Sequence, residues 1–401
     1  MPYKFRTMRK NIFITILLIA TSILSATGNE ELQATQLETE SFGILLEKHH
    51  PITSEESHNL YLGINSNVFI RNAEYFLPYT KGYTAFGFYL DPTLAYHIND
   101  KAAVSAGVHL MGIAGTDGLR DVQPLFRIEY QPKNWISIVG GSLYGNLNHR
   151  LYEPMYDFDR YFYAFDEKGL QILTNTRRWE ADLWCNWETF IEPGDDFQER
   201  FTFGWTNRLY AIGEKNGNDA FQLSIPVHIL ATHRGGQFTS LQDTCIETLA
   251  NAMVGLTNSI NTPDKTIKKS TLDLSLFGFK NNSNEEHIHT HFKEGWGFYP
   301  NLTLQTKAWK LQTGYWMAHQ FVGARGSYLF QSVAYFDEAF ERADRKMITA
   351  KLFYEHRYQG LGVGFETQAY HDLDENSTDF SFGFYLRFED RFKLLKIKEK
   401  E

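Results

Sequence analysis

Apolar and polar positions alternate with a period of two along most of the chain. The clearest segment is 179–188, where Leu183 and the other odd positions are apolar, while Asp182 and most even positions are polar. The same alternation recurs in four further segments, at 84–97, 104–110, 221–229 and 361–368. Because successive side chains of a β-strand point to opposite faces, this period predicts strands with one apolar and one polar face.

Three features of these segments favour a membrane barrel over a soluble sandwich. They run for about 10–13 residues, whereas strands of soluble sheets usually have about 5–6. Tyr, Trp and Phe recur near strand ends, where barrels carry aromatic girdles, and charged residues stand in mid-strand on the polar face. Alternation alone does not fix which face is wet, so a secreted all-β carbohydrate-binding protein stays open as an alternative.

Short and long connections alternate between the predicted strands. The short ones lie near 99–100, 131–134, 177–178, 214–219, 307–308 and 357–359, and the long ones are 71–82, 149–168, 189–199, 280–293 and 319–345. Outer-membrane barrels place short turns in the periplasm and long loops outside, so residues 328–336 belong to an external loop. The pattern predicts an all-β, antiparallel transmembrane β-barrel of about 16 strands (14–18). The region 239–270 fits either one strand near Ile246–Gly255 or a short helix in a loop.

The N-terminus has the pattern of a secretory signal peptide. A basic stretch with Lys4 and Arg9 precedes the apolar run Ile12–Leu24, and the small residues at 26–28 fit a cleavage site. The apolar run is shorter than the ~20 residues that a spanning helix needs. We expect four parts, namely a signal peptide at 1–28, a periplasmic N-terminal segment at 29–58, the transmembrane β-barrel at 59–389 and a charged C-terminal tail at 390–401.

The composition excludes other classes of protein. The 401 residues carry a formal net charge of −9, which argues against a nucleic-acid binder because such a protein presents a basic face. Mean hydropathy is −0.38, which is low for a helical membrane protein. Two cysteines, Cys185 at a predicted lipid-facing position and Cys245 in the uncertain region, cannot form a disulfide framework.

Several motifs carry a resemblance to known barrels. The predicted C-terminal strand has apolar residues at 380, 382, 384, 386 and 388. It resembles the aromatic strand that barrel-assembly machinery recognises. The other motifs are RNAEYF at 71–76, GYT at 82–84, GNLNH at 145–149 and HRGGQ at 233–237. With these motifs the chain resembles Gram-negative outer-membrane β-barrels of porin type, and more narrowly an uncharacterised porin-like family. The resemblance implies a fold and a location in the bacterial outer membrane, but no chemistry.

The polar strand face is the first place to look for function. Its charged and amide residues are expected to line a pore and to filter solutes by charge and size. These predicted pore-lining residues are Arg127, Glu129, Glu180, Asp182, Asn186, Glu188, Arg208, Lys351, Glu355 and Glu366. These residues include both positive and negative charges, so the sequence does not indicate a pore selective for one sign of charge. Alternatively, these side chains only solvate the inner wall.

The loop at 149–168 is unusually aromatic for a solvated loop. One interpretation is a constriction loop that folds inward, in which five residues would contact solutes: Tyr156, Asp157, Asp159, Arg160 and Tyr161. The alternative is an external lid that packs on itself.

The sequence shows no convincing catalytic or metal-binding motif. Ser224 and His228 share a strand face, but their Cα atoms would be ~13 Å apart, too far for a hydrogen bond. The histidines at 287, 289 and 291 alternate in a predicted loop, where a solvated segment is the simpler interpretation than a metal site. We therefore predict no catalytic residues, no metal, no cofactor and no enzyme activity.

The main hypothesis is a porin-like outer-membrane channel for passive diffusion of small hydrophilic solutes such as saccharides or ions. Two further functions remain as alternatives to it. They are an outer-membrane barrel enzyme acting on lipid or glycan, and a barrel whose loops bind a surface partner. The expected partners are outer-membrane lipid, the solutes themselves and the barrel-assembly machinery during biogenesis, with no nucleic acid.

Overall fold

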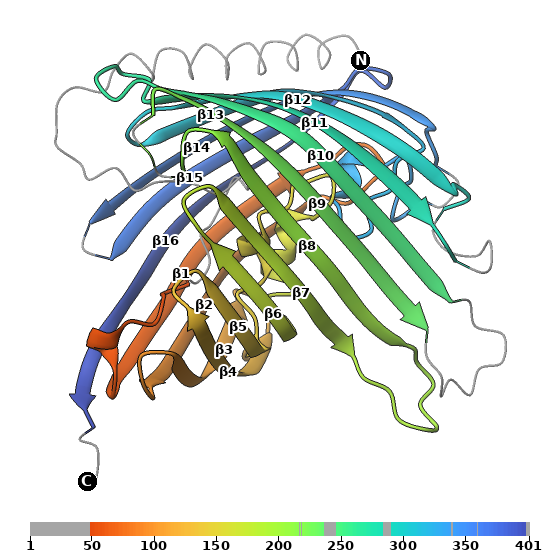
Figure 1. Ribbon diagram of the computed structural model, residues 1–401. Helices are drawn as coiled ribbons and strands as arrows, with labels where there is room; N and C mark the ends of the chain where they lie inside the picture. Colours follow the sequence, from red (N-terminus) through yellow and green to blue (C-terminus); the bar gives the residue numbers. More distant parts are fainter. Residues whose placement is uncertain are drawn as a thin grey trace.

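The computed structural model describes residues 49–215, 217, 219–235, 246–283, 290–337, 340–358 and 360–397. In this part of the chain, sixteen strands form one closed antiparallel barrel in which each strand pairs with its neighbours in sequence (Figure 1). The predicted fold class is thereby confirmed, including the strand number. No helix in the described ranges is long and apolar enough to cross a membrane.

The strands are long, as the alternation predicted. They are β1 (Asn59–Glu74), β2 (Tyr83–His97), β3 (Ala102–Ile113), β4 (Asp121–Lys133), β5 (Ile136–Ser142), β6 (Lys168–Asn175), β7 (Trp179–Thr189), β8 (Glu199–Ile212), β9 (Phe221–Gly235), β10 (Glu247–Asn261), β11 (Lys269–Asn281), β12 (Glu294–Gln305), β13 (Trp309–His319), β14 (Asp344–Tyr358), β15 (Leu361–Asp372) and β16 (Ser377–Lys396). In the uncertain region, the strand alternative is the one observed, as β10.

β1 and β16 close the barrel. Their register runs from Asn59 opposite Lys396 to Glu74 opposite Phe380, so β16 continues through most of the segment that was predicted as a charged tail. The predicted boundary at 390 is therefore too early. The extension has a simple cause, because β1 begins at Asn59 and offers backbone partners to residues 390–396.

The described end of the predicted N-terminal segment contacts the inside of the barrel. His49 Nε2 lies 2.7 Å from Glu129 Oε1, and the Ile52 backbone N–H donates to Gln131 Oε1 at 2.7 Å. A short 3₁₀ helix, η1 (Ser54–Glu56), then leads into β1. The predicted signal peptide at 1–28 lies outside the described residues.

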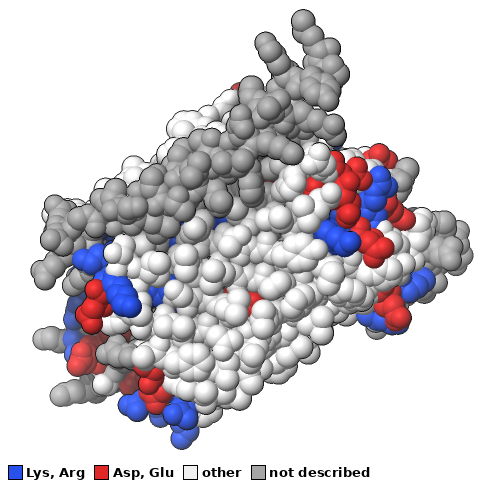
Figure 2. Space-filling view, turned by 90° about the horizontal axis from the view of Figure 1, so that it is seen from above, with Lys and Arg blue, Asp and Glu red and all other residues white. Residues whose placement is uncertain are grey.

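The two faces of the barrel wall have opposite character. On β7, Leu183 is 36% exposed on the outer face, whereas its neighbour Asp182 is 1% exposed on the inner face. Figure 2 shows the charged side chains gathered toward the two ends of the visible face, with a broad band between them that is nearly free of charge. An apolar band on the outside of a closed barrel is the surface that lipid requires, because hydrocarbon cannot hydrate charge.

Short and long connections separate to opposite ends, as predicted. We call these the turn end, with tight turns such as 176–178, and the loop end, with long connections such as 143–167 and 320–343. Residues 328–336 fall in the latter loop. In outer-membrane barrels the turn end faces the periplasm and the loop end faces outside.

Two long loops fold into the barrel and form its core. The inner loop, residues 143–167, carries the 3₁₀ helices η2 (Asn146–His149) and η3 (Phe158–Phe162), which Figure 1 shows in yellow inside the ring of strands. The second loop, 320–343, is called the cap loop and carries η4 (Tyr328–Phe330).

The packing of these loops against the wall is dense. Met155 of the inner loop and Phe330 of the cap loop belong to the same cluster as Trp184, Phe277 and Trp316 of the wall, and all five are at most 2% exposed. A second cluster joins Phe69, Tyr89 and Tyr385 of the wall to Leu147 and Tyr161 of the inner loop. The hydrophobic core of this protein therefore lies within the barrel, at its loop end.

Candidate active site inside the barrel

His149 is the last residue of η2 and contacts the wall from inside the barrel. Arg150, which follows it, has a left-handed backbone with φ of 58°, so the chain reverses direction there. The outgoing and returning limbs of the loop are tied together by Asn146, whose Nδ2 donates to the Ala164 carbonyl at 3.0 Å. The loop is thus a folded unit that presents one imidazole to the wall.

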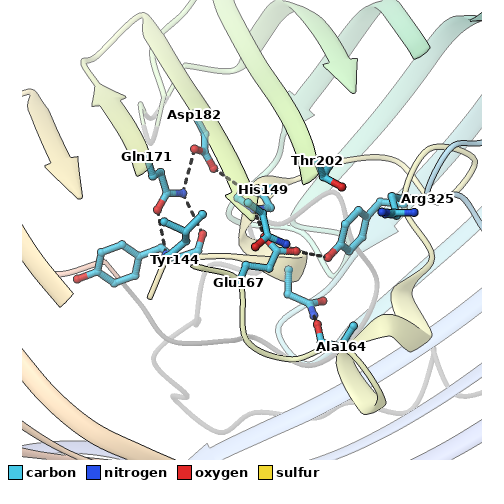
Figure 3. Close-up of polar contacts among 12 residues, drawn as sticks. Tyr144, His149, Ala164, Glu167, Gln171, Asp182, Thr202 and Arg325 are labelled. Atoms are coloured by element: carbon cyan, nitrogen blue, oxygen red, sulfur yellow. Dashed lines mark hydrogen bonds and ion pairs between the residues drawn. The ribbon is translucent and has the colours of Figure 1, made fainter. Parts of the chain in front are cut away.

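The imidazole is held on both nitrogens by carboxylates (Figure 3). Nδ1 lies 2.7 Å from Asp182 Oδ2 of β7, and Nε2 lies 2.6 Å from Glu167 Oε2 at the end of the inner loop. The ring stacks on Trp184 with centroids 3.6 Å apart and planes 6° from parallel. His149 is 0% exposed.

The two carboxylates are themselves held by hydrogen bonds. Gln171 Nε2 donates to Asp182 Oδ1 at 2.9 Å and also to the Tyr144 carbonyl at 3.1 Å. Tyr156 donates its hydroxyl to Glu167 Oε1 at 2.6 Å. Such partners fix the orientation of the carboxylates, and through them the orientation of the ring.

The cluster favours a charged imidazole. Burial by itself lowers the pKa of His149, but the negative charges of Asp182 and then Glu167 outweigh it and raise this pKa to about 9. Burial raises the pKa of Glu167, yet His149 and the Tyr156 hydroxyl together lower it to about 2. In this closed arrangement His149 is an imidazolium between two carboxylates.

The predicted pore-lining residues all lie on strands at inward positions of the alternation, eight buried and Glu188 and Arg208 half-buried. Several of them contact the inserted loops. Besides Asp182, Glu188 pairs with Arg325 of the cap loop at 2.6 Å, and Lys351 pairs with Glu153 of the inner loop. These charges anchor loops in the lumen.

Three further predicted pore-lining residues contact groups of the wall. Glu366 pairs with Arg71 at 2.6 Å, and Glu355 pairs with Arg387 at 3.0 Å. Arg127 donates to the Ser142 carbonyl at 2.7 Å. The paired arrangement shows how a wall with mixed charge signs can be buried.

The predicted constriction loop lies inside the barrel and contacts the wall, whereas contact of its five named residues with solutes stays a prediction. Asp159 pairs with Arg71 of β1 at 3.0 Å, and Tyr161 accepts a hydrogen bond from Asn67 of the wall at 3.2 Å. Arg160 lies over the Tyr156 ring at 5.4 Å. Burial, and then the charge of Asp159, raise the pKa of Asp157 to about 7. The loop fills the lumen together with the cap loop instead of narrowing an open pore.

Other predicted positions carry less chemistry. Ser224 and His228 both lie on the inner face, and Ser224 Oγ accepts from Arg208 at 3.0 Å. His287, His289 and Cys245 lie outside the described residues. Within the described ranges, no group of three or more His, Cys, Asp or Glu side chains is placed to hold a metal ion.

Sequence reasoning identified Asp182 only as a lumen charge and His149 only as part of a motif. It missed Glu167 and Trp184 altogether. The usable signal was a histidine at the start of an aromatic loop beside a strand with an acidic inner face, but nothing in the sequence shows that the loop enters the barrel.

Two cavities inside the barrel lie toward the turn end, below the inner loop. One cavity of about 590 Å³ is bounded by the wall around β1–β4 and β16, and another of about 280 Å³ by the wall around β7–β13. We call them the large vestibule and the small vestibule. Asn148 of η2 borders both, so the tip of the inner loop separates them.

Comparison with known proteins gives one family and a set of folds. A family model described as lipid A 3′-O-deacylase-type matches residues 52–397. This is the description of an enzyme, so the prediction that the chain has no enzyme activity is wrong. The comparison with curated proteins found no relative.

Solved structures that resemble the chain at low identity include an outer membrane protein, a BenF-like porin and OprB. OprD from Pseudomonas aeruginosa has a TM-score of 0.48 and 8% identity, covering 86% of this chain and 98% of that one. OprB from Pseudomonas putida has a TM-score of 0.49 and 9% identity, covering 83% and 94%. A BenF-like porin from Pseudomonas fluorescens has a TM-score of 0.48 and 6% identity, covering 84% and 100%.

Proposed function

Since the chain belongs to the lipid A 3′-O-deacylase-type family, we propose that it is an outer-membrane hydrolase that removes an ester-linked acyl chain from a lipid A-type glycolipid. The observation that supports this most directly is His149, an oriented imidazole on an inserted loop. The apolar outer band puts the barrel among outer-membrane lipids, where such a substrate resides, and the barrel-assembly machinery would insert it there.

Asp182 supplies the orientation that a general base needs. By accepting a hydrogen bond from Nδ1–H, Asp182 fixes the tautomer in which Nε2 is free to take up a proton. His149 Nε2 would remove a proton from a water molecule as the water oxygen attacks the ester carbonyl carbon. The bond from that carbon to the sugar oxygen then breaks, and the sugar oxygen takes the proton back from Nε2. The products are a fatty acid and a sugar hydroxyl.

Glu167 makes the present arrangement a closed one. Its carboxylate occupies Nε2, the atom that has to meet the water, and His149 is fully buried. Glu167 directly precedes β6, so the activating movement has to shift this junction away from the ring while η2 and His149 stay against Asp182. Without this second carboxylate the pKa of His149 falls toward its ordinary value, and the ring can then act as a base.

The filled lumen argues against the main sequence-based hypothesis, passive diffusion. A barrel of this size leaves an aqueous channel unless its loops plug it. Here the inner loop and the cap loop share one buried cluster with the wall. The protein is therefore porin-like in its barrel architecture.

The experiment compares two buried histidines. His109 also has Nδ1 on a carboxylate, Asp91 at 2.6 Å, and stacks on Phe165 with centroids 4.0 Å apart, which makes it a matched control. Full-length protein is reconstituted in vesicles containing lipid A, and released fatty acid is measured by mass spectrometry. We expect H149Q to lower the rate by about 10²–10⁴-fold and H109Q to keep it, because only the former removes the base.

Folding of each variant is checked by heat-modifiable gel mobility. Two results would contradict the proposal, namely no release of fatty acid by the wild-type protein, or an H149Q variant as active as the wild type.

A further inference from the structure

The small vestibule is strongly basic although the chain as a whole is acidic. Five cationic side chains border it: Arg150, Arg208, Lys215, Lys269 and Lys310. Two carboxylates border it, Glu180 and Asp273, which leaves an excess of three positive charges in a chain whose net charge is −9. No part of the proposed hydrolysis uses this excess.

Glu180 is shared among three of the cations. It pairs with Arg150 at 2.5 Å, with Lys215, and more distantly with Arg208 at 4.0 Å. One carboxylate cannot neutralise three cations, and the side chains of Glu180 and Arg208 are only 6% and 13% exposed. Removing like charges from water together is costly, so this wall favours an added anion.

A second part of the wall, on β11 and β13, carries Lys269 and Lys310 beside Asp273. Asp273 already accepts hydrogen bonds from Thr257 at 2.5 Å and from the Tyr152 hydroxyl at 3.3 Å. Lys310 is 7% exposed. The two cationic walls thus face the same space of about 280 Å³ from different strands.

Neutral hydrogen-bonding groups make up much of the rest of the lining. They are hydroxyls and amides from several strands, including Gln222, Ser259, Thr303 and Gln312. Such groups suit the hydroxyls of a sugar, whereas the cations suit a group with two negative charges. A cavity of about 280 Å³ has room for several water molecules, which a small phosphorylated sugar would replace.

The large vestibule provides an internal contrast. It is bordered by Arg127, Arg357 and Arg391 but by five carboxylates: Asp91, Glu129, Asp166, Glu389 and Asp390. Its balance of charge is negative when its histidines are neutral. The basic character is therefore local to one half of the turn end.

We propose that the small vestibule is a binding site for a phosphate monoester carrying hydroxyl groups, entering from the turn end. The cations hold the phosphate dianion, as charge-assisted hydrogen bonds to phosphate do elsewhere, and the hydroxyl and amide wall holds the sugar part. This site is separate from His149, although Arg150, the next residue, contributes to it.

Calorimetric titration of the full-length protein in detergent tests the site at neutral pH and low salt. The probes are inorganic phosphate, glucose 6-phosphate and glucose. We expect saturable binding of phosphate, tighter binding of glucose 6-phosphate and no binding of glucose. Glucose bound as tightly as glucose 6-phosphate, or no binding of either phosphate compound, would overturn the proposal.

Variants that change the charge of the small vestibule in opposite directions sharpen the test. The pair K269Q/K310Q is expected to weaken phosphate binding about tenfold or more, and D273N is expected to strengthen it, because the first lowers and the second raises the excess charge. K269Q alone serves if the double variant does not fold. The matched control R357Q/R391Q removes two cations from the large vestibule and is expected to leave binding unchanged. If K269Q/K310Q, or K269Q alone, binds phosphate as tightly as the wild type does, the proposed site is wrong.

Discussion

The two ends of the lumen differ in what they contain. At the loop end, the inner loop and the cap loop fill the barrel, and polar groups such as His149 are held by partners on two sides. At the turn end, the wall leaves two vestibules, one of which carries more positive than negative charge. The filled end is suited to hold a fixed geometry, and the hollow end is suited to admit a ligand.

The difference arises from loop length. Turn-end connections such as 306–308 are too short to reach the lumen, whereas the inner loop spans 143–167 and returns to the adjacent strand. A barrel wall of alternating residues is the same at both ends, so only the longer connections can convert a hollow barrel into a packed one.

The largest expected effect follows from emptying the filled end. Replacing residues 150–164 by a short Gly-Ser linker should open an aqueous path, because the barrel itself is wide enough for one. In planar bilayers we expect little conductance from the wild-type protein and porin-like single-channel steps from the variant. Equal conductance of the two would show that the loops do not block the lumen.

Loss of the wall carboxylate should loosen the inner loop. D182N leaves His149 with one carboxylate, and breaking a buried pair of this kind costs about 3–5 kcal/mol. We expect trypsin to cut the inner loop, at Arg150 or Arg160, about a hundredfold faster than in the wild type. The matched variant D91N removes the carboxylate partner of His109. Because His109 does not tether the inner loop by a hydrogen bond, trypsin should cut the inner loop of D91N at close to the wild-type rate.

Docking of the inner loop should depend on pH in a defined direction. The pKa of His149 is raised from 6.5 to about 9, so its contribution to stability is complete below 6.5 and is lost as pH rises through 9. The pKa of Glu167 is lowered from 4.5 to about 2, so its contribution is complete above 4.5 and is lost as pH falls through 2. We expect tightest docking at about pH 4.5–6.5.

The fluorescence of Trp184, taken as the difference between the wild type and W184F, reports this docking because the ring stacks on His149. A signal that stays constant from pH 6 to 10 would contradict the assigned ion pair.

The smallest effect concerns the packing under Trp184. A Cβ at Gly204 would lie 2.1 Å from the Trp184 ring, so G204A should displace the ring and the stacked imidazole at a cost of about 1–3 kcal/mol. We expect deacylation to fall about tenfold. At Gly278 the nearest atom to an added Cβ is 4.0 Å away, so G278A is the control that should keep full activity. A G204A variant with unchanged activity would mean that the stack does not position His149.

Much of the wall could be predicted from the sequence. The alternation at 179–188 correctly placed Leu183 outside and Asp182 inside, and the parity of connections correctly placed 328–336 in a loop. Strand direction and face follow from local periodicity, because a one-residue shift would expose every charge to lipid. The end of β16 was missed because it depends on where β1 begins, which is not a local property.

The sequence by itself determined the architecture, a long-stranded closed barrel with an apolar outside and a polar inside, since a period of two acts residue by residue. Only the tertiary structure decided what the inside contains. His149 is 33 residues from Asp182 and 18 from Glu167, and the three meet because a loop enters the lumen and is held there by side-chain packing. Packing of that kind depends on shape and distance across the barrel, which no local pattern encodes.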